Sequence, residues 1–304
     1  MASLNGETFE IVRGDDTLDI TDLTTTGLNN SFAVVEFEGL GMAPVERFEQ
    51  AGPTQHGATD VGFRLLPRVI RMSVLAEAGT PDVFHERRER LLQMCKPSRT
   101  PIILRWTLSD GRVWQLDCHY AGGLDMPTTS AGRVGRNGFR DVIVLRAADP
   151  TWYNPEGYSQ SFAVSYSASG HVYPEVFPTL YGGSTVSTTL NVAMTEPAAW
   201  DSAPVFTATG LLTNLIITNT TTGAKLDFTG YSIPSTHVWT ITTGYGLVEV
   251  VDQTGTNQIS KLTTDSTIST FRLVEGDNEI TVTATVLDAS AALVIQGNER
   301  LIGK

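Results

Sequence analysis

Apolar and polar side chains alternate along most of the chain, in short runs that turn residues separate. A period of two is typical of β-strands that bury one face. In the first half of the chain this pattern predicts strands near residues 9–13, 32–38, 68–75, 102–108, 112–120 and 141–147. Between two of them, Asp110-Gly111 predicts a tight hairpin turn in which both central residues have positive φ.

One segment departs from this alternation and predicts a helix over about residues 81–95. Thr80 offers an oxygen to the free amides of the first turn, Pro81 sets φ there, and Asp82 lies at the positive end of the dipole. The apolar residues that share one stripe, and that we expect to pack on a sheet, are Val83, Phe84, Leu91, Leu92 and Cys95. Pro97 ends the helix, which gives the order strand, helix, strand.

The second half of the chain has a different composition, because Thr, Ser, Asn and Gly dominate segments such as TNTTTGAKLDFTG. Short apolar runs bracketed by turn residues predict a jelly-roll-like β-sandwich of about eight strands. The segment ADPTWYNPEG contains two prolines and a glycine, so we interpret it as a linker. We therefore predict a mainly β protein of two domains. Residues 1–155 form a split-barrel or β-sandwich domain with one helix, and residues 156–304 form a second β-sandwich.

Charge, cysteine content and hydrophobicity limit which partners and which cellular compartment are expected for the chain. The 304 residues include 21 basic and 33 acidic side chains, a net charge of −12, which argues against sequence-specific nucleic-acid binding. We expect Cys95 and Cys118 to be two buried thiols made in a reducing compartment, not a disulfide. No apolar run reaches the ~18 residues of a membrane span, and no leader opens the chain, so a soluble protein is expected.

Motifs that carry chemistry are absent from the sequence. His85-Glu86-Arg87-Arg88-Glu89 resembles the helical zinc-protease signature, but Glu89 stands where the second histidine is needed. There is no nucleophile elbow and no phosphate-binding loop. The sequence gives no distance between the carboxylates of the second half, so it identifies no pair of them as a general acid and a general base. We therefore predict no catalytic residue, no metal site, no cofactor and no enzyme activity.

Seven segments of the first half follow one another in this order: Pro53-Thr-Gln-His-Gly, Pro67-Arg-Val-Ile-Arg-Met, Phe84-His-Glu-Arg-Arg-Glu-Arg-Leu-Leu, Pro101-Ile-Ile-Leu, Gly111-Arg, Tyr120-Ala-Gly-Gly-Leu and Val142-Ile-Val-Leu-Arg-Ala-Ala-Asp-Pro-Thr-Trp-Tyr. Together they resemble the siphophage distal tail protein family over about half of the chain. In the second half, Phe271-Arg-Leu-Val-Glu-Gly-Asp-Asn-Glu-Ile is similar to the galectin-like sandwich that such proteins carry.

The resemblance implies a structural protein of the virion. Members of the family form a ring, usually a hexamer, at the end of the tail, with the first domain below the tail tube and the second pointing outward. The implied partners are the tail tube protein, the tail hub protein and the tape-measure protein. The implied location is the tail tip, after assembly in the cytoplasm of the bacterial host. DNA would pass through the lumen, and an acidic protein suits that passage because it repels phosphate.

The ring interpretation needs polar contacts between subunits. Arginine is favoured at such contacts because its planar guanidinium binds a carboxylate through two hydrogen bonds. Our candidates are Arg68, Arg71, the helix residues Arg87, Arg88 and Arg90, and the residues of a glycine-rich loop, Arg133, Arg136 and Arg140.

Three alternatives stay open at the level of sequence. In the first alternative, the second domain is a carbohydrate-binding or receptor-binding module that stacks host glycan on Trp200, Trp239 or Tyr245. A hydrolase that degrades the cell wall is the second, without a pair of carboxylates to nominate. An ordinary two-domain cytosolic protein with no role in assembly is the third.

Overall fold

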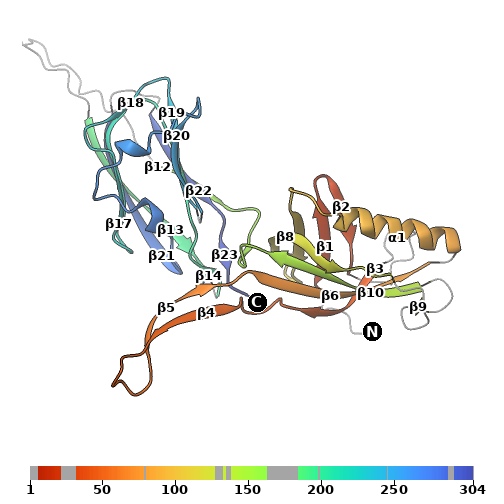
Figure 1. The fold of residues 1–304 in the computed structure, drawn as a ribbon. Coiled ribbons are helices and arrows are strands. Elements are labelled where there is room, and N and C mark those ends of the chain that lie inside the picture. Colours follow the sequence, from red (N-terminus) through yellow and green to blue (C-terminus); the bar gives the residue numbers. More distant parts are fainter. Residues whose placement is uncertain are drawn as a thin grey trace, which may run out of the picture. The chain divides into compact units, whose positions relative to one another are not determined.

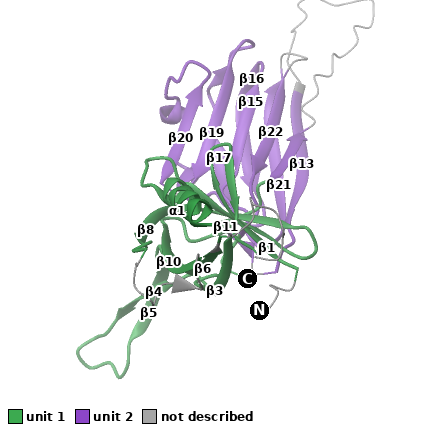
Figure 2. Cartoon of the chain, turned by 90° about the vertical axis from the view of Figure 1, so that its right-hand side faces the viewer, with its two compact units in different colours: residues 1–155, 301–304 green, residues 156–300 purple. Residues whose placement is uncertain are grey.

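A computed structural model of the chain describes residues 6–21, 32–78, 80–126, 133–134, 138–162, 184–197, 199–244, 246–286 and 291–303. The chain divides into two compact units, shown in Figure 2. Unit 1 combines Met1–Pro155 with Leu301–Lys304, and unit 2 is Glu156–Arg300. The predicted mainly β fold is confirmed, with one α-helix among the described residues. Because residues 301–304 group with unit 1, the second unit is an insertion in the chain of the first.

Unit 1 contains two antiparallel sheets that share strand β8 (Val113–Gly123). The first half of β8 pairs with β7 and β11, and its second half pairs with β10. Beyond β8, the first sheet contains β2 (Asp16–Asp19), β1 (Thr8–Arg13), β7 (Ile102–Thr107) and β11 (Trp152–Tyr153). Beyond β8, the second sheet contains β10 (Gly138–Ala147), β6 (Arg68–Glu77), β3 (Phe32–Glu38) and β9 (Arg133–Val134). A strand that passes from one sheet to the other gives the split-barrel arrangement expected from the sequence.

The helix α1 (Pro81–Cys95) packs on these sheets (Figure 1). Its first turn is capped as predicted, since the Thr80 hydroxyl accepts a hydrogen bond from the amide of Val83. The buried stripe differs from the predicted one: Leu91, Met94 and Cys95 are buried, whereas Leu92 is 46% exposed. Leu92 follows Leu91 by about 100° around the helix axis, which turns it away from the sheet while Met94 fills the stripe.

The core of unit 1 is rich in aromatic side chains. Phe9 stacks on Trp106 at 5.4 Å between ring centroids, and Trp106 meets Trp152 edge to face at 5.5 Å. Leu301 belongs to the same core and is 1% exposed. Its burial explains why the last residues of the chain group with unit 1.

The hairpin predicted at Asp110-Gly111 joins β7 to β8, but its turn differs from the predicted one. Only Gly111 has positive φ, at 89°, and Asp110 does not. The amide of Leu108 donates to the carbonyl of Arg112, so three residues separate the paired positions. A three-residue loop needs positive φ only at its last position, where glycine is favoured.

Unit 2 is a sandwich of two five-stranded antiparallel sheets. One sheet has the order β12 (Tyr158–Phe162), β22 (Ala292–Gly297), β15 (Val205–Thr209), β19 (Val238–Gly244) and β20 (Leu247–Asp252). The other contains β13 (Ser184–Met194), β21 (Gly276–Val286), β16 (Leu212–Asn219), β17 (Ala224–Asp227) and β18 (Ser232–Ile233). Its short elements are β14 (Ala199–Trp200) and the 3-10 turns η1 (Ile259–Lys261) and η2 (Ile268–Thr270), and the chain returns to unit 1 within β23 (Arg300–Leu301). The sandwich has two strands more than the eight expected.

Candidate assembly surface

Strands β4 (Val45–Gln50) and β5 (Thr59–Leu65) form a hairpin that projects from the body of unit 1 (Figures 1 and 2). Within the described part of the chain these two strands pair only with each other. Large apolar side chains are exposed along the hairpin: Val45 (43%), Phe48 (44%), Val61 (64%) and Phe63 (51%). An isolated two-stranded hairpin is marginally stable in water, so this arm is suited to lie against a partner.

One face of the hairpin is organised around Arg47. Arg47 is directly opposite Phe63 in the register, so their side chains share a face. The guanidinium lies 6.0 Å from the centroid of the Phe63 ring, and its Nη1 donates to Oδ2 of Asp60 at 2.6 Å.

The opposite face repeats this arrangement with other residues. Arg64 is directly opposite Glu46, and its Nε donates to Oε2 of Glu46 at 2.6 Å. The same guanidinium lies 5.6 Å from the centroid of the Phe48 ring. Each face therefore presents an arginine, an aromatic ring and a carboxylate. Because exposed ion pairs contribute only about 0–1 kcal/mol each, both arginines remain available to a partner.

This hairpin is not among the strands predicted from the sequence. The segments VERFEQ and TDVGFRL both alternate, and they flank AGPTQHGA, which supplies Gly52, Pro53 and Gly57 for the turn. The alternation typical of strands is therefore present in the sequence, but each face of the hairpin mixes charged and aromatic residues. Strand prediction looks for one apolar face, and this hairpin has none.

A buried arginine holds the base of the hairpin. Arg68 is 1% exposed, so its predicted role as a surface contact between subunits is wrong. Its guanidinium donates to five backbone carbonyls: Gly39 (2.6 Å), Leu40 (3.1 Å), Gly41 (2.5 Å), Pro150 (2.8 Å) and Ile302 (2.5 Å). Burial lowers the pKa of Arg68. The carbonyls stabilise the charge. Through these bonds the side chain ties together the hairpin base at residues 39–41, Pro150 before the chain enters unit 2, and Ile302 near the C-terminus.

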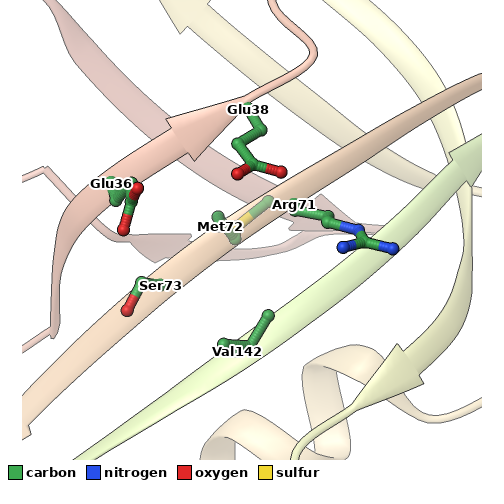
Figure 3. Close-up of a pocket in the computed structure, with 6 residues that line it drawn as sticks. All are labelled: Glu36, Glu38, Arg71, Met72, Ser73 and Val142. Atoms are coloured by element: carbon green, nitrogen blue, oxygen red, sulfur yellow. The ribbon is translucent and has the colours of Figure 1, made fainter.

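A shallow hollow of about 160 Å³ lies on the outer face of β3, β6 and β10 (Figure 3). Its lining residues are Glu36 and Glu38 from β3, Arg71, Met72 and Ser73 from β6, and Val142 from β10. The register sets Glu36 opposite Ser73 and Glu38 opposite Arg71. The hollow thus combines two carboxylates and the guanidinium of Arg71 with the apolar side chains of Met72 and Val142. We call it the acidic groove.

Two of the candidate arginines lie on the same outer face as the acidic groove. Arg71 lines it, and its guanidinium has no hydrogen bond or ion pair with any residue that the structure describes. Arg140 donates from Nε to the hydroxyl of Ser73 at 2.8 Å and lies 3.6 Å from the carboxylate of Glu36. Arg133 has only its backbone described, in β9, and Arg136 lies outside the described residues.

The helix arginines are partly engaged within unit 1. Arg90 forms a two-pronged ion pair with Asp16 of β2. Arg88 donates from Nε to Sδ of Met126 at 3.1 Å. Burial lowers the pKa of Arg87, which is half-buried on the helix. These three side chains support the packing of the helix, and their role as subunit contacts stays a prediction.

The aromatic residues proposed for glycan contact do not form a surface. Trp239 is 1% exposed and meets Phe228 edge to face at 5.6 Å in the core of unit 2, so its predicted contact with glycan is wrong. Trp200 is half-buried in β14, and Tyr245 lies outside the described residues. A tryptophan in an alternating strand faces the core whenever the register places it there, and sequence alone does not give that register.

Groups suited to chemistry are not gathered in the part of the chain that the structure describes. No cluster of three or more His, Cys, Asp or Glu side chains there is arranged to hold a metal ion. The carboxylate of Asp252 accepts hydrogen bonds from Thr254 and Thr256, which lower its pKa and close a turn. Cys95 and Cys118 are free and buried, as predicted. None of the described helices is long and apolar enough to cross a membrane.

The fold is similar to that of Dit from phage SPP1, a crystal structure with which the TM-score is 0.62. The similarity covers 96% of this chain and 99% of that chain at 15% sequence identity. The chain has the fold of a phage distal tail protein. This confirms the fold that the resemblance in the sequence implied.

Two further structures match with lower scores. They are chains of the phage P2 baseplate in its activated conformation, one with Ca and one with Sr. Both have a TM-score of 0.48 and cover 95% of this chain and 97% of their own, at 11% and 10% identity. A scan against protein-family models and a search of curated protein sequences give no match.

Proposed function

We propose that this chain is a distal tail protein: a structural subunit of a ring that joins the tail tube of a siphophage to the hub at the tail tip. The observation that carries the proposal is the fold shared with SPP1 Dit over nearly the whole length of both chains. SPP1 Dit is a paradigm of the hub adsorption apparatus in phages that infect Gram-positive bacteria. The tail tube protein, the hub protein and the tape-measure protein are the neighbours we propose in the virion.

The surface chemistry of unit 1 supports an assembly role. A closed ring of identical chains needs two different complementary surfaces on each chain. Unit 1 offers a projecting hairpin and, on separate strands, an acidic groove in an exposed sheet face. In this role the protein acts mechanically, by setting the symmetry of the hub and leaving a lumen for DNA.

Native mass spectrometry and negative-stain electron microscopy of the purified chain test the proposal. We expect closed rings with a central hole and six times the subunit mass. As a matched test in the virus, labelling with an antibody against unit 2 should mark the tail tip alone. Particles that stay monomeric at high protein concentration, together with tails that carry no label at the tip, would contradict the proposal.

A further inference from the structure

Exposed apolar side chains gather on two surfaces of unit 1. Eleven large hydrophobic side chains are exposed in the described part of the chain, and eight of them fall on these surfaces. On the hairpin and its base they are Met42, Val45, Phe48, Val61 and Phe63, and on β3, β6 and β10 they are Val35, Val69 and Val142. Exposed apolar patches mark protein interaction sites, so both surfaces are suited to bury against protein.

The two surfaces are chemically complementary. The hairpin presents a guanidinium beside an aromatic ring on each face, through Arg47 and Arg64. The acidic groove presents the carboxylates of Glu36 and Glu38 beside Val142, together with the guanidinium of Arg71, and Arg140 lies 3.6 Å from Glu36. The hairpin likewise carries the carboxylates of Asp60 and Glu46, so each surface offers groups of both signs that can pair with the other. Arginine binds carboxylates through paired hydrogen bonds, while an aromatic ring beside it covers apolar surface.

The hairpin cannot reach the groove of its own chain. It continues outward from the ends of β3 and β6, whose outer face carries the groove, and points away from the body of unit 1 (Figures 1 and 2). Its base is fixed by Arg68 and by a hydrogen bond of 2.8 Å from the amide of Leu66 to the carbonyl of Pro44. A contact between hairpin and groove therefore joins two chains.

We infer that the β4–β5 hairpin of one copy docks in the acidic groove of the next copy, with Arg47 and Arg64 facing Glu36 and Glu38. The inference rests on the proposed ring function and names the contact that closes the ring. It is a heterologous contact, because it uses a different surface on each side. Repeated around an axis, it gives a ring rather than a two-fold dimer.

Charge reversal tests this contact, with two variants of the full chain. The hairpin variant carries Arg47→Glu and Arg64→Glu, and the groove variant carries Glu36→Arg and Glu38→Arg. We expect each variant alone to need about tenfold more protein, or more, for half of the chains to assemble, because like charges then meet across the contact. An equimolar mixture should assemble within about threefold of wild type, since alternating copies restore opposite charges.

Three controls keep the outcome unambiguous. Arg99→Glu with Arg112→Glu makes the same charge change elsewhere on unit 1 and should leave assembly unchanged. Neutral Arg47→Gln with Arg64→Gln should weaken assembly less than charge reversal does. Thermal melting of each variant checks that the fold is retained, and a mixture that regains rings shows that both chains were folded.

The possible results distinguish the proposed ring function from the proposed contact between hairpin and groove. Rings from wild type and equally from the hairpin variant would overturn the inference and leave the ring function standing. Single variants that fail without rescue in the mixture would overturn the pairing of hairpin with groove. Wild type that forms rings neither when purified nor in the virion would overturn the proposed function, and the inference with it.

Discussion

Replacement of Arg68 by methionine removes the guanidinium that ties three segments of unit 1 together. Two of its five acceptors, the carbonyls of Pro150 and Ile302, form buried hydrogen bonds with it. A buried acceptor left without a partner costs about 1–3 kcal/mol. The three carbonyls at the hairpin base are partly accessible, so water replaces most of that loss. We expect Arg68→Met to lower the free energy of unfolding by about 4 kcal/mol.

The matched control is Arg146→Met, which removes the same charge from an exposed position on the neighbouring strand β10. We expect that change to stay within about 0.5 kcal/mol. Urea unfolding followed by tryptophan fluorescence measures both variants at one protein concentration, because assembly itself shifts apparent stability.

Hydrogen exchange adds a local readout of the same change. The amide of Ala43 donates to the carbonyl of Ile302 at 3.2 Å, and that of Leu66 donates to Pro44 at 2.8 Å. Both amides should lose protection in Arg68→Met and keep it in the control. A loss of less than 1 kcal/mol in the variant, with protection unchanged, would refute the reasoning that Arg68 holds the hairpin base.

Three further predictions follow from burial and charge. Leu91→Ala should cost about 2–5 kcal/mol in urea unfolding, because Leu91 is fully buried, whereas Leu92→Ala should cost under about 0.5 kcal/mol; equal costs would contradict the helix orientation. Burial raises the pKa of Cys95 and of Cys118 to about 12, so neither thiol should react with a maleimide at pH 7.5 until the protein is unfolded; fast labelling of native protein would disprove their burial. The hydrogen bond from Arg90 lowers the pKa of Asp16 in the folded state, so this pair stabilises above the unfolded value of about 3.9 and is lost as the pH falls through the lower folded value. The melting temperature of Asp16→Asn should therefore lie below wild type at pH 7 and approach it as the pH falls through the lowered pKa of Asp16. A difference that stays constant with pH would argue against the ion pair.

The parts of the fold that were predictable from the sequence are those set by residues that act on their immediate neighbours in the chain. The helix start was predicted because Thr80, Pro81 and Asp82 act on the adjacent turn, and the cap is observed. The hairpin between β7 and β8 was predicted for a similar reason, since Gly111 supplies the positive φ that its turn requires.

Other features depend on contacts between distant segments, and the sequence did not predict them. The partners of Arg68 are backbone carbonyls 27 to 234 positions away, and a carbonyl carries no signature of residue type. Charged residues are rarely buried without an ionic partner, so a surface position was the natural expectation. Trp239 was misplaced for the equivalent reason in unit 2, where the register of β19 turns it inward. The β4–β5 hairpin was missed because its pattern belongs to an arm exposed on both faces, not to a strand of a core.

Cryo-electron microscopy of the tail tip, in virions that contain this chain, tests the ring proposal most directly. The result we predict is a ring of six copies between the tail tube and the hub, with each β4–β5 hairpin lying on the β3, β6 and β10 face of the next copy. A tail tip whose density at that level fits another protein, with this chain elsewhere in the virion or absent from it, would contradict the proposal.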